Sequence, residues 1–149
     1  MAASSIRETG SVHPCSRTKK PRGVVSASTA ASSRALPTGT VTFLFADVEG
    51  STRLARELGD EWKGVLRDIR RLLREAVAAA DGHEVDSRGD ELFAVFAEAE
   101  TAAEAAVDAQ RRIAGHNWPA PVRVRVGLHS GIAALAEDGY VGVEVHRAY

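Results

Sequence analysis

The sequence predicts an α+β fold: a ferredoxin-like (palm-like) β-α-β-β-α-β sandwich with helices on one face of a mostly antiparallel sheet. Two observations lead to this prediction. Segments with strand-like alternation and segments with helical spacing follow one another in the order β, α, α, β, β, α, β. A two-residue turn joins two of the strands directly, as in a hairpin. Another helix is expected where the chain ends, so we predict a C-terminally incomplete fold.

The first 38 residues differ in composition from the rest of the 149-residue chain. Ala, Ser, Thr, Gly, Pro and Arg dominate this segment without any sustained period. It therefore cannot bury enough apolar surface to offset the entropy of ordering. We predict a disordered leader over residues 1–38 and one folded domain over residues 39–149.

Charge and cysteine content exclude several classes of protein. The net charge is −1, and positive charge is concentrated in the leader, so the folded part is mildly acidic and has no nucleic-acid footprint. The single cysteine, Cys15, excludes an intramolecular disulfide. No run of about 18 apolar residues is present, so we expect no membrane segment and a cytoplasmic protein.

The first folded stretch combines a strand, an acid and a helix start. An apolar run over about 41–47 ends in Asp47, and a helix pattern begins at Ser51 and stops at Gly59. The turn at Gly50 brings free backbone N–H groups beside the carboxylate, which suits a cation that carries a phosphate.

The remaining elements follow with few connecting residues. Asp60 is the expected N-cap of the next helix, and Gly89-Asp90 is the expected hairpin turn. The predicted bounds are 60–80 for this helix, 83–88 and 91–96 for the hairpin strands, 98–114 for an Ala-rich helix, and 121–128 for a strand that alternates apolar and basic residues.

Two acids stand out by their position in this order. Asp47 ends the first strand and Asp90 lies in the hairpin turn, and the two strands are neighbours in a β-α-β-β-α-β sheet. Their carboxylates can therefore converge on divalent ions that also bind phosphates. On spacing alone the alternative remains that Asp47 caps a helix and Asp90 is an ordinary turn residue.

Four motifs stand in order along about residues 38–149. They are Phe43 to Thr52, Gly89-Asp90, Val126 to Gly131 and Tyr140 to Ala148. Together they resemble the class III adenylate/guanylate cyclase catalytic domain in its actinobacterial-type variant. The resemblance implies conversion of a nucleoside triphosphate, ATP or GTP, to a 3′,5′-cyclic monophosphate and pyrophosphate.

The resemblance also implies roles for particular residues. Asp47 and Asp90 match the family's metal-binding aspartates, and Val48 matches the residue whose backbone carbonyl helps to hold the second of two Mg²⁺ or Mn²⁺ ions. A head-to-tail homodimer is implied, because the family's site lies between two chains. The expected binders of the β- and γ-phosphates are the turn N–H groups of Glu49, Gly50, Ser51 and Thr52.

The sequence departs from the family pattern at two functional positions. Asp86 replaces the base-selecting lysine and cannot donate to adenine N1, so the choice between ATP and GTP stays open. His146 stands at the position of the transition-state asparagine, and the arginine expected four residues later lies beyond Tyr149. A cyclase without that arginine should be slowed by a factor of roughly 10³ to 10⁵.

Two other functions therefore remain in view. A degenerate or truncated cyclase domain could act as a dimerisation or nucleotide-binding module. A diguanylate cyclase is the less favoured alternative, because the stretch from Arg88 to Phe93 only partly matches that family's signature.

Overall fold

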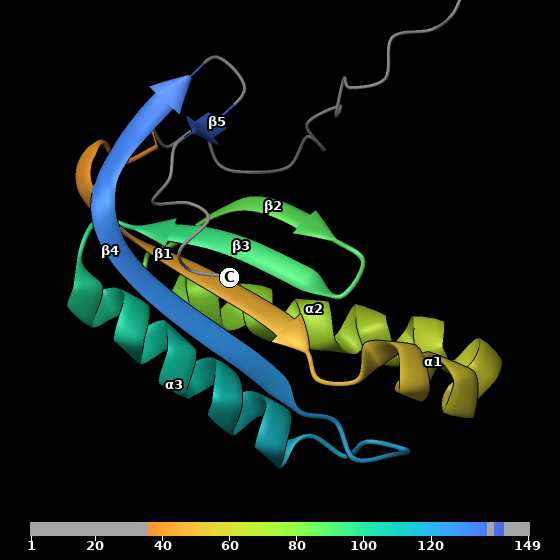
Figure 1. Cartoon of the computed structure of the whole chain (residues 1–149). Helices are drawn as coiled ribbons and strands as arrows, with labels where there is room; N and C mark the ends of the chain where they lie inside the picture. Colours follow the sequence, from red (N-terminus) through yellow and green to blue (C-terminus); the bar gives the residue numbers. More distant parts are fainter. Residues whose placement is uncertain (1–35, 137–138, 142–149) are drawn as a thin grey trace, which may run out of the picture. The chain divides into compact units, whose positions relative to one another are not determined.

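The sheet is built around β1 (Gly39–Val48), which has a partner strand on each side. The structure is a computed structural model, and it describes residues 36–136 and 139–141. The strand order is β2-β3-β1-β4-β5, and every pairing is antiparallel (Figure 1). The other strands are β2 (His83–Arg88), β3 (Glu91–Phe96), β4 (Val124–Ala136) and β5 (Gly139–Val141).

Helices cover one face of this sheet, as Figure 1 shows, and the predicted α+β fold with its helix-covered sheet is confirmed. They are α1 (Ser51–Leu58), a 3₁₀ turn η1 (Gly59–Glu61), α2 (Trp62–Ala79) and α3 (Ala99–Gly115).

The helix-covered face contains the larger core. Leu44, Ala46 and Val48 of β1 pack against the buried faces of α2 and α3. The sheet-facing side of α3 consists of alanines and one isoleucine, and these small residues allow the helix to approach the sheet closely. The fully buried members at the centre include Ile69 and Ala76 of α2, which are 0% exposed.

The opposite face carries a second, aromatic cluster. The rings of Phe45 and Phe93 are stacked with centroids 4.3 Å apart, and Phe43 contacts both Phe93 and the edge of Tyr140. The Tyr140 hydroxyl donates a hydrogen bond of 2.5 Å to the carbonyl of Pro37, which fastens β5 to the segment before β1.

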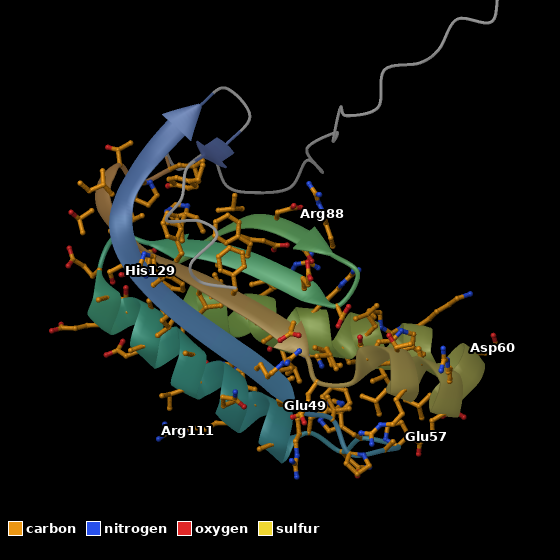
Figure 2. All side chains as sticks on the ribbon, viewed as in Figure 1. Glu49, Glu57, Asp60, Arg88, Arg111 and His129 are labelled. Atoms are coloured by element: carbon orange, nitrogen blue, oxygen red, sulfur yellow. The ribbon has the colours of Figure 1, made fainter. Side chains whose placement is uncertain are left out.

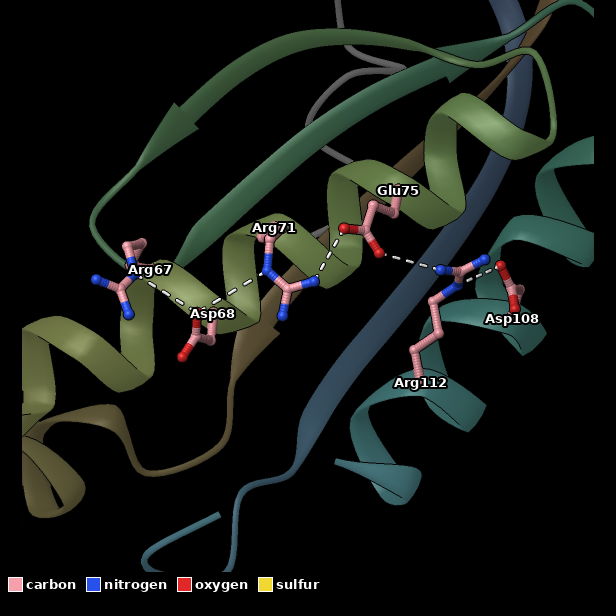
Figure 3. Close-up of polar contacts among 6 residues, drawn as sticks. All are labelled: Arg67, Asp68, Arg71, Glu75, Asp108 and Arg112. Atoms are coloured by element: carbon pink, nitrogen blue, oxygen red, sulfur yellow. Dashed lines mark hydrogen bonds and ion pairs between the residues drawn. The ribbon is translucent and has the colours of Figure 1, made fainter. Parts of the chain in front are cut away.

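A chain of ion pairs joins α2 to α3 on the outer surface (Figure 3). Glu75 of α2 accepts from Arg71 at 2.9 Å and from Arg112 of α3 at 3.1 Å. Arg112 also pairs with Asp108 at 2.7 Å, and Arg67 pairs with Asp68 at 3.5 Å. Because these side chains are partly or largely exposed, each pair contributes little by itself, and the network mainly links the two helices.

Several boundaries differ from those predicted. Asp60 does not cap α2: it lies within η1, which runs directly into the helix, and no side-chain cap is formed. β4 continues to Ala136 instead of ending near residue 128, because residues through Ala133 pair with β1. The predicted leader, up to residue 35, and the expected final helix lie outside the described residues.

The hairpin has the predicted strand bounds, with one irregularity. Glu84 lies opposite Ala94 and Asp86 lies opposite Phe93, so Val85 is an extra residue in β2. No helix in the described ranges is both long enough and apolar enough to cross a membrane.

Candidate active site

Asp47 lies near the end of β1 and is held by an arginine from the neighbouring strand. Asp47 and Arg125 are direct partners in the β1–β4 register. Arg125 donates two hydrogen bonds to the carboxylate, from Nε to Oδ1 at 3.1 Å and from Nη2 to Oδ2 at 2.5 Å. Such a two-point contact fixes the orientation of the carboxylate and neutralises its charge.

Asp90 contributes to the same electrostatic environment. The pKa of the Arg125 guanidinium is raised above its ordinary value, chiefly by the hydrogen bond to Asp47 and further by the charges of Asp47, Glu49 and Asp90. The recorded β1–β3 register ends at Ala46 opposite Leu92, so the hairpin turn lies alongside the last residues of β1. Asp47 and Asp90 thus both favour the charged form of the Arg125 guanidinium.

The backbone of Val48 points toward the hairpin turn. The N–H of Glu49 donates to the carbonyl of Arg123 at 2.9 Å, which extends the ladder between β1 and β4. Consecutive residues in an antiparallel strand direct their backbone groups to opposite neighbours. The Val48 carbonyl is therefore directed to the β3 side of β1, where the turn with Asp90 lies.

The turn after β1 leaves backbone donors at the start of α1. Gly50 adopts a left-handed conformation with φ 67° and ψ 31°, which favours glycine. Its carbonyl accepts the N–H groups of Arg53 at 2.9 Å and Leu54 at 3.1 Å, so the donors without a helical partner are those that precede them. The N–H of Glu49 is bonded to β4. Of the four N–H groups expected to bind phosphates, those of Gly50, Ser51 and Thr52 therefore remain open.

The donor set near Asp47 fits a hard divalent cation. Two carboxylates and one backbone carbonyl are oxygen ligands of the kind that Mg²⁺ and Mn²⁺ accept, and Arg125 already supplies a positive charge beside Asp47. Within the described ranges, no group of three or more His, Cys, Asp or Glu could hold a metal ion. Any further ligands would therefore be phosphate oxygens and water, which is the usual coordination of Mg²⁺ on nucleotides.

Asp86 has polar partners of its own in β2. Its carboxylate accepts the backbone N–H of Ser87 at 2.8 Å and pairs with Arg88 at 2.7 Å. It lies opposite Phe93, so it shares the helix-free face of the sheet with the aromatic cluster. Two strands, β3 and β1, separate β2 from Arg125 on β4.

Two histidines, His129 and His146, lie in the third and fourth sequence motifs, and the structure describes only the first of them. His129 is half-buried within β4 opposite Phe43, four residues along the strand from Arg125, or about 13 Å away. Figure 2 shows His129 far along β4 from Glu49, which marks the turn after β1. His146 lies outside the described residues.

Arg125 is the site residue that sequence reasoning missed. Its alternation with apolar neighbours predicted only a half-exposed strand, and 68% of its side chain is in fact exposed. The signal that could have found it is cross-strand register: an antiparallel pairing that sets Gly127 opposite Phe45 also sets Arg125 opposite Asp47.

The fold is that of a ferredoxin-like α+β domain, with Asp47 and Arg125 paired beside the start of α1. The family model for the adenylate and guanylate cyclase catalytic domain matches residues 34–145. The chain belongs to this family, and the resemblance drawn from its four motifs is confirmed.

The chain is also similar to curated proteins of mycobacteria. An uncharacterized protein of Mycobacterium tuberculosis is 38% identical over 117 residues, covering 77% of this chain and 39% of the relative. The chain thus spans about two fifths of the length of the curated relatives that it matches first.

Solved structures show the same fold. A monomeric adenylate cyclase from Trypanosoma brucei superposes with a TM-score of 0.70 at 23% identity, covering 78% of this chain and 70% of that chain. The guanylate cyclase domain of RhGC from Catenaria anguillulae, solved in complex with GTP, superposes with a TM-score of 0.66 at 20% identity, covering 74% of this chain and 70% of that chain.

Proposed function

We propose that this chain is a nucleotidyl cyclase domain of intracellular signalling, which converts ATP or GTP to a 3′,5′-cyclic monophosphate and pyrophosphate with two divalent cations. The observation that carries the proposal is the two-point contact of Arg125 with Asp47 beside the open start of α1. Family membership indicates the class of reaction. The carboxylate, the guanidinium and the open N–H groups are the kinds of group that this reaction needs.

Asp47, Asp90 and the Val48 carbonyl would hold the ions, Mg²⁺ or Mn²⁺. When bound, the ions would favour ionisation of the attacking 3′-oxygen and neutralise charge on the leaving pyrophosphate. The N–H groups of Gly50, Ser51 and Thr52 would bind the β- and γ-phosphates.

Arg125 would change partner as substrate binds. In the free domain it neutralises Asp47. A metal ion on Asp47 replaces that positive charge, so the guanidinium becomes available to a phosphate oxygen a short distance away. This exchange would keep the charge of the site balanced in both states.

Assembly would complete the site. We propose a head-to-tail homodimer in the cytoplasm, in which Asp86 and His146 of one chain would face the nucleotide bound by Asp47 and Asp90 of its partner. His146 would donate a hydrogen bond to the reacting phosphate in place of the asparagine usual in the family.

A second candidate function, a nucleotide-binding or dimerisation module without turnover, is favoured by the state of Asp86. Its carboxylate is engaged with Arg88 and with the N–H of Ser87, so this position offers acceptors and no base-reading donor.

The test is product formation by the purified full chain with Mn²⁺ and ATP or GTP, measured as cyclic nucleotide by chromatography. Asp47→Asn should lower the rate by more than about 100-fold, since even partners behind a metal ligand are worth roughly 10- to 100-fold. Glu57→Gln is the matched control, because this exposed acid lies on α1 away from the site (Figure 2) and should leave the rate unchanged.

The remaining outcomes separate the candidates. Metal-dependent nucleotide binding that requires Asp47 but gives no product would support the non-catalytic module. Absence of both binding and product would sink the cyclase and the nucleotide-binding module and leave only a dimerisation module.

A further inference from the structure

Arg70 differs from its neighbours among the arginines of α2. Arg67 and Arg71 pair with acids on their own helix, and their side chains are 76% and 49% exposed. Arg70 is half-buried, and its Nη2 donates to the backbone carbonyl of Gly89, in the turn of the β2–β3 hairpin. Arg70 is thus distinguished from Arg67 and Arg71 by a contact that leaves its own helix.

The accepting carbonyl has a particular position in the chain. The peptide unit that contains the Gly89 carbonyl also contains the N–H of Asp90. A hydrogen bond to this oxygen therefore fixes the orientation of the Gly89–Asp90 peptide plane. Gly89 has φ 54°, and glycine crosses easily between backbone regions. A glycine peptide without an external contact can therefore rotate and carry the following residue with it.

The turn also lies past the ends of both strand ladders. The β2–β3 register ends at Arg88 opposite Glu91, and the β1–β3 register ends at Ala46 opposite Leu92. Gly89 and Asp90 thus receive no support from the recorded sheet pairing. Arg70 reaches them from the helix layer, which Figure 1 shows beneath the hairpin.

The guanidinium of Arg70 has fewer hydrogen bonds than we would expect if the contact only stabilised the fold. Its Nε is buried and has no hydrogen-bond partner among the described residues. A buried donor without a partner is unfavourable, and such groups often accompany a functional constraint.

We propose that Arg70 is a positioning residue for the metal site: it holds the Gly89–Asp90 peptide so that the Asp90 carboxylate meets the ion bound by Asp47. This inference rests on the proposed cyclase function. It assigns to α2, a helix that contributes no metal ligand, control over the geometry of one of the two aspartates.

The direct test is hydrogen–deuterium exchange of the full chain, without nucleotide or metal. Arg70→Met keeps the length of the side chain and removes its donors. Exchange in the segment 87–92 should become roughly tenfold faster, the scale of one lost bond to a charged donor. Arg67→Met is the matched control, since Arg67 is on the same helix and pairs with its own neighbour. Unchanged exchange in 87–92 would overturn the inference.

The functional test is Mn²⁺ binding, followed by the electron paramagnetic resonance of the free ion. The apparent affinity should weaken roughly tenfold in Arg70→Met, recover in part in Arg70→Lys, which retains a donor, and stay unchanged in Arg67→Met. Product formation, where measurable, should return toward the wild-type rate at saturating Mn²⁺, which general loss of folded protein would not produce.

The two proposals fail in different ways. Asp90-dependent Mn²⁺ binding that is unaltered in Arg70→Met overturns the role of Arg70 and leaves the cyclase proposal in place. If wild-type protein shows no Mn²⁺ binding that depends on Asp90, the cyclase proposal fails, and the positioning role fails with it.

Discussion

The two faces of the sheet are built from different residues for different purposes. The helix-covered face is aliphatic except for Phe96, and its buried positions belong to one continuous core. The other face gathers the rings of Phe43, Phe45, Phe93 and Tyr140, and on this face β1 carries Asp47 and β4 carries Arg125.

The difference shows how one strand can serve stability and chemistry together. In β1, residues 44, 46 and 48 point into the core, and the alternate residues 43, 45 and 47 point to the other face. Changes on the helix-covered face should therefore act on unfolding, and changes at the end of the other face should act on ligand binding.

The largest expected effect on stability comes from the helix-covered face. Ile69→Ala removes a fully buried side chain at the centre of α2 and should lower the free energy of unfolding by about 2–5 kcal/mol. Urea denaturation measures this loss. A loss smaller than about 1 kcal/mol would contradict the contrast between the two faces, because it would mean that the helix-covered core is not the main source of stability.

A methyl group added to the same face should also destabilise. At Gly82 a Cβ would lie 2.4 and 2.5 Å from the ring of Phe96 and 2.9 Å from Val77, so Gly82→Ala should cost about 1–3 kcal/mol. Gly64→Ala, within α2, meets no atom within 4 Å and should be neutral or stabilise by up to about 1 kcal/mol. Equal effects in thermal unfolding would contradict the packing described.

A smaller, pH-dependent effect is expected at the edge of the aromatic cluster. Burial raises the pKa of Tyr140 above its ordinary value of 10.0. The folded state therefore holds the phenol proton more tightly than the unfolded state, and this contribution is complete below pH 10 and declines as pH rises above it.

Tyr140→Phe removes both the titration and the hydrogen bond to Pro37. At neutral pH it should lose about 0.5–1.5 kcal/mol, and above pH 10 its stability should fall less steeply than that of the wild type. If the curves of unfolding free energy against pH for the wild type and Tyr140→Phe run parallel, Tyr140 does not cause the loss of stability above pH 10.

The smallest effect on unfolding is expected for Arg125→Met, because its side chain is largely exposed. Ligand binding should respond instead: Mn²⁺ alone should bind more tightly, since Asp47 is released, and the triphosphate should bind about tenfold more weakly. Calorimetric titration of each ligand measures both changes. If both affinities fall together, Arg125 organises Asp47 and does not exchange partners.

Local patterns predicted most of the fold. The hairpin strands were predicted at their observed bounds, because the turn signal Gly89-Asp90 separates a short polar segment from a short apolar run. The end of β4 was not predicted, because Gly131 looks like a loop residue, and pairing with Val41 of β1 keeps it in the strand.

The sequence draws attention to Asp47 and Asp90, but not to the contacts of Arg125 with Asp47 and of Arg70 with the Gly89 carbonyl. Asp47 and Asp90 stand at turns that any reading of the chain detects. Arg125 acquires its role from strand register, and Arg70 from the placement of a helix against a hairpin. Both contacts join residues far apart in the chain, so no local pattern contains them.

The extra residue Val85 in β2 has a consequence for comparing relatives. The pairing is regular from the turn back to Asp86, which lies opposite Phe93, so the bulge changes the faces only of Glu84 and His83, the residues that precede Val85. Deletion of Val85 would restore simple alternation, and the residues before it would change faces relative to those after it. Relatives aligned without a gap at this point can therefore present different side chains to the same face while their sequences look equivalent.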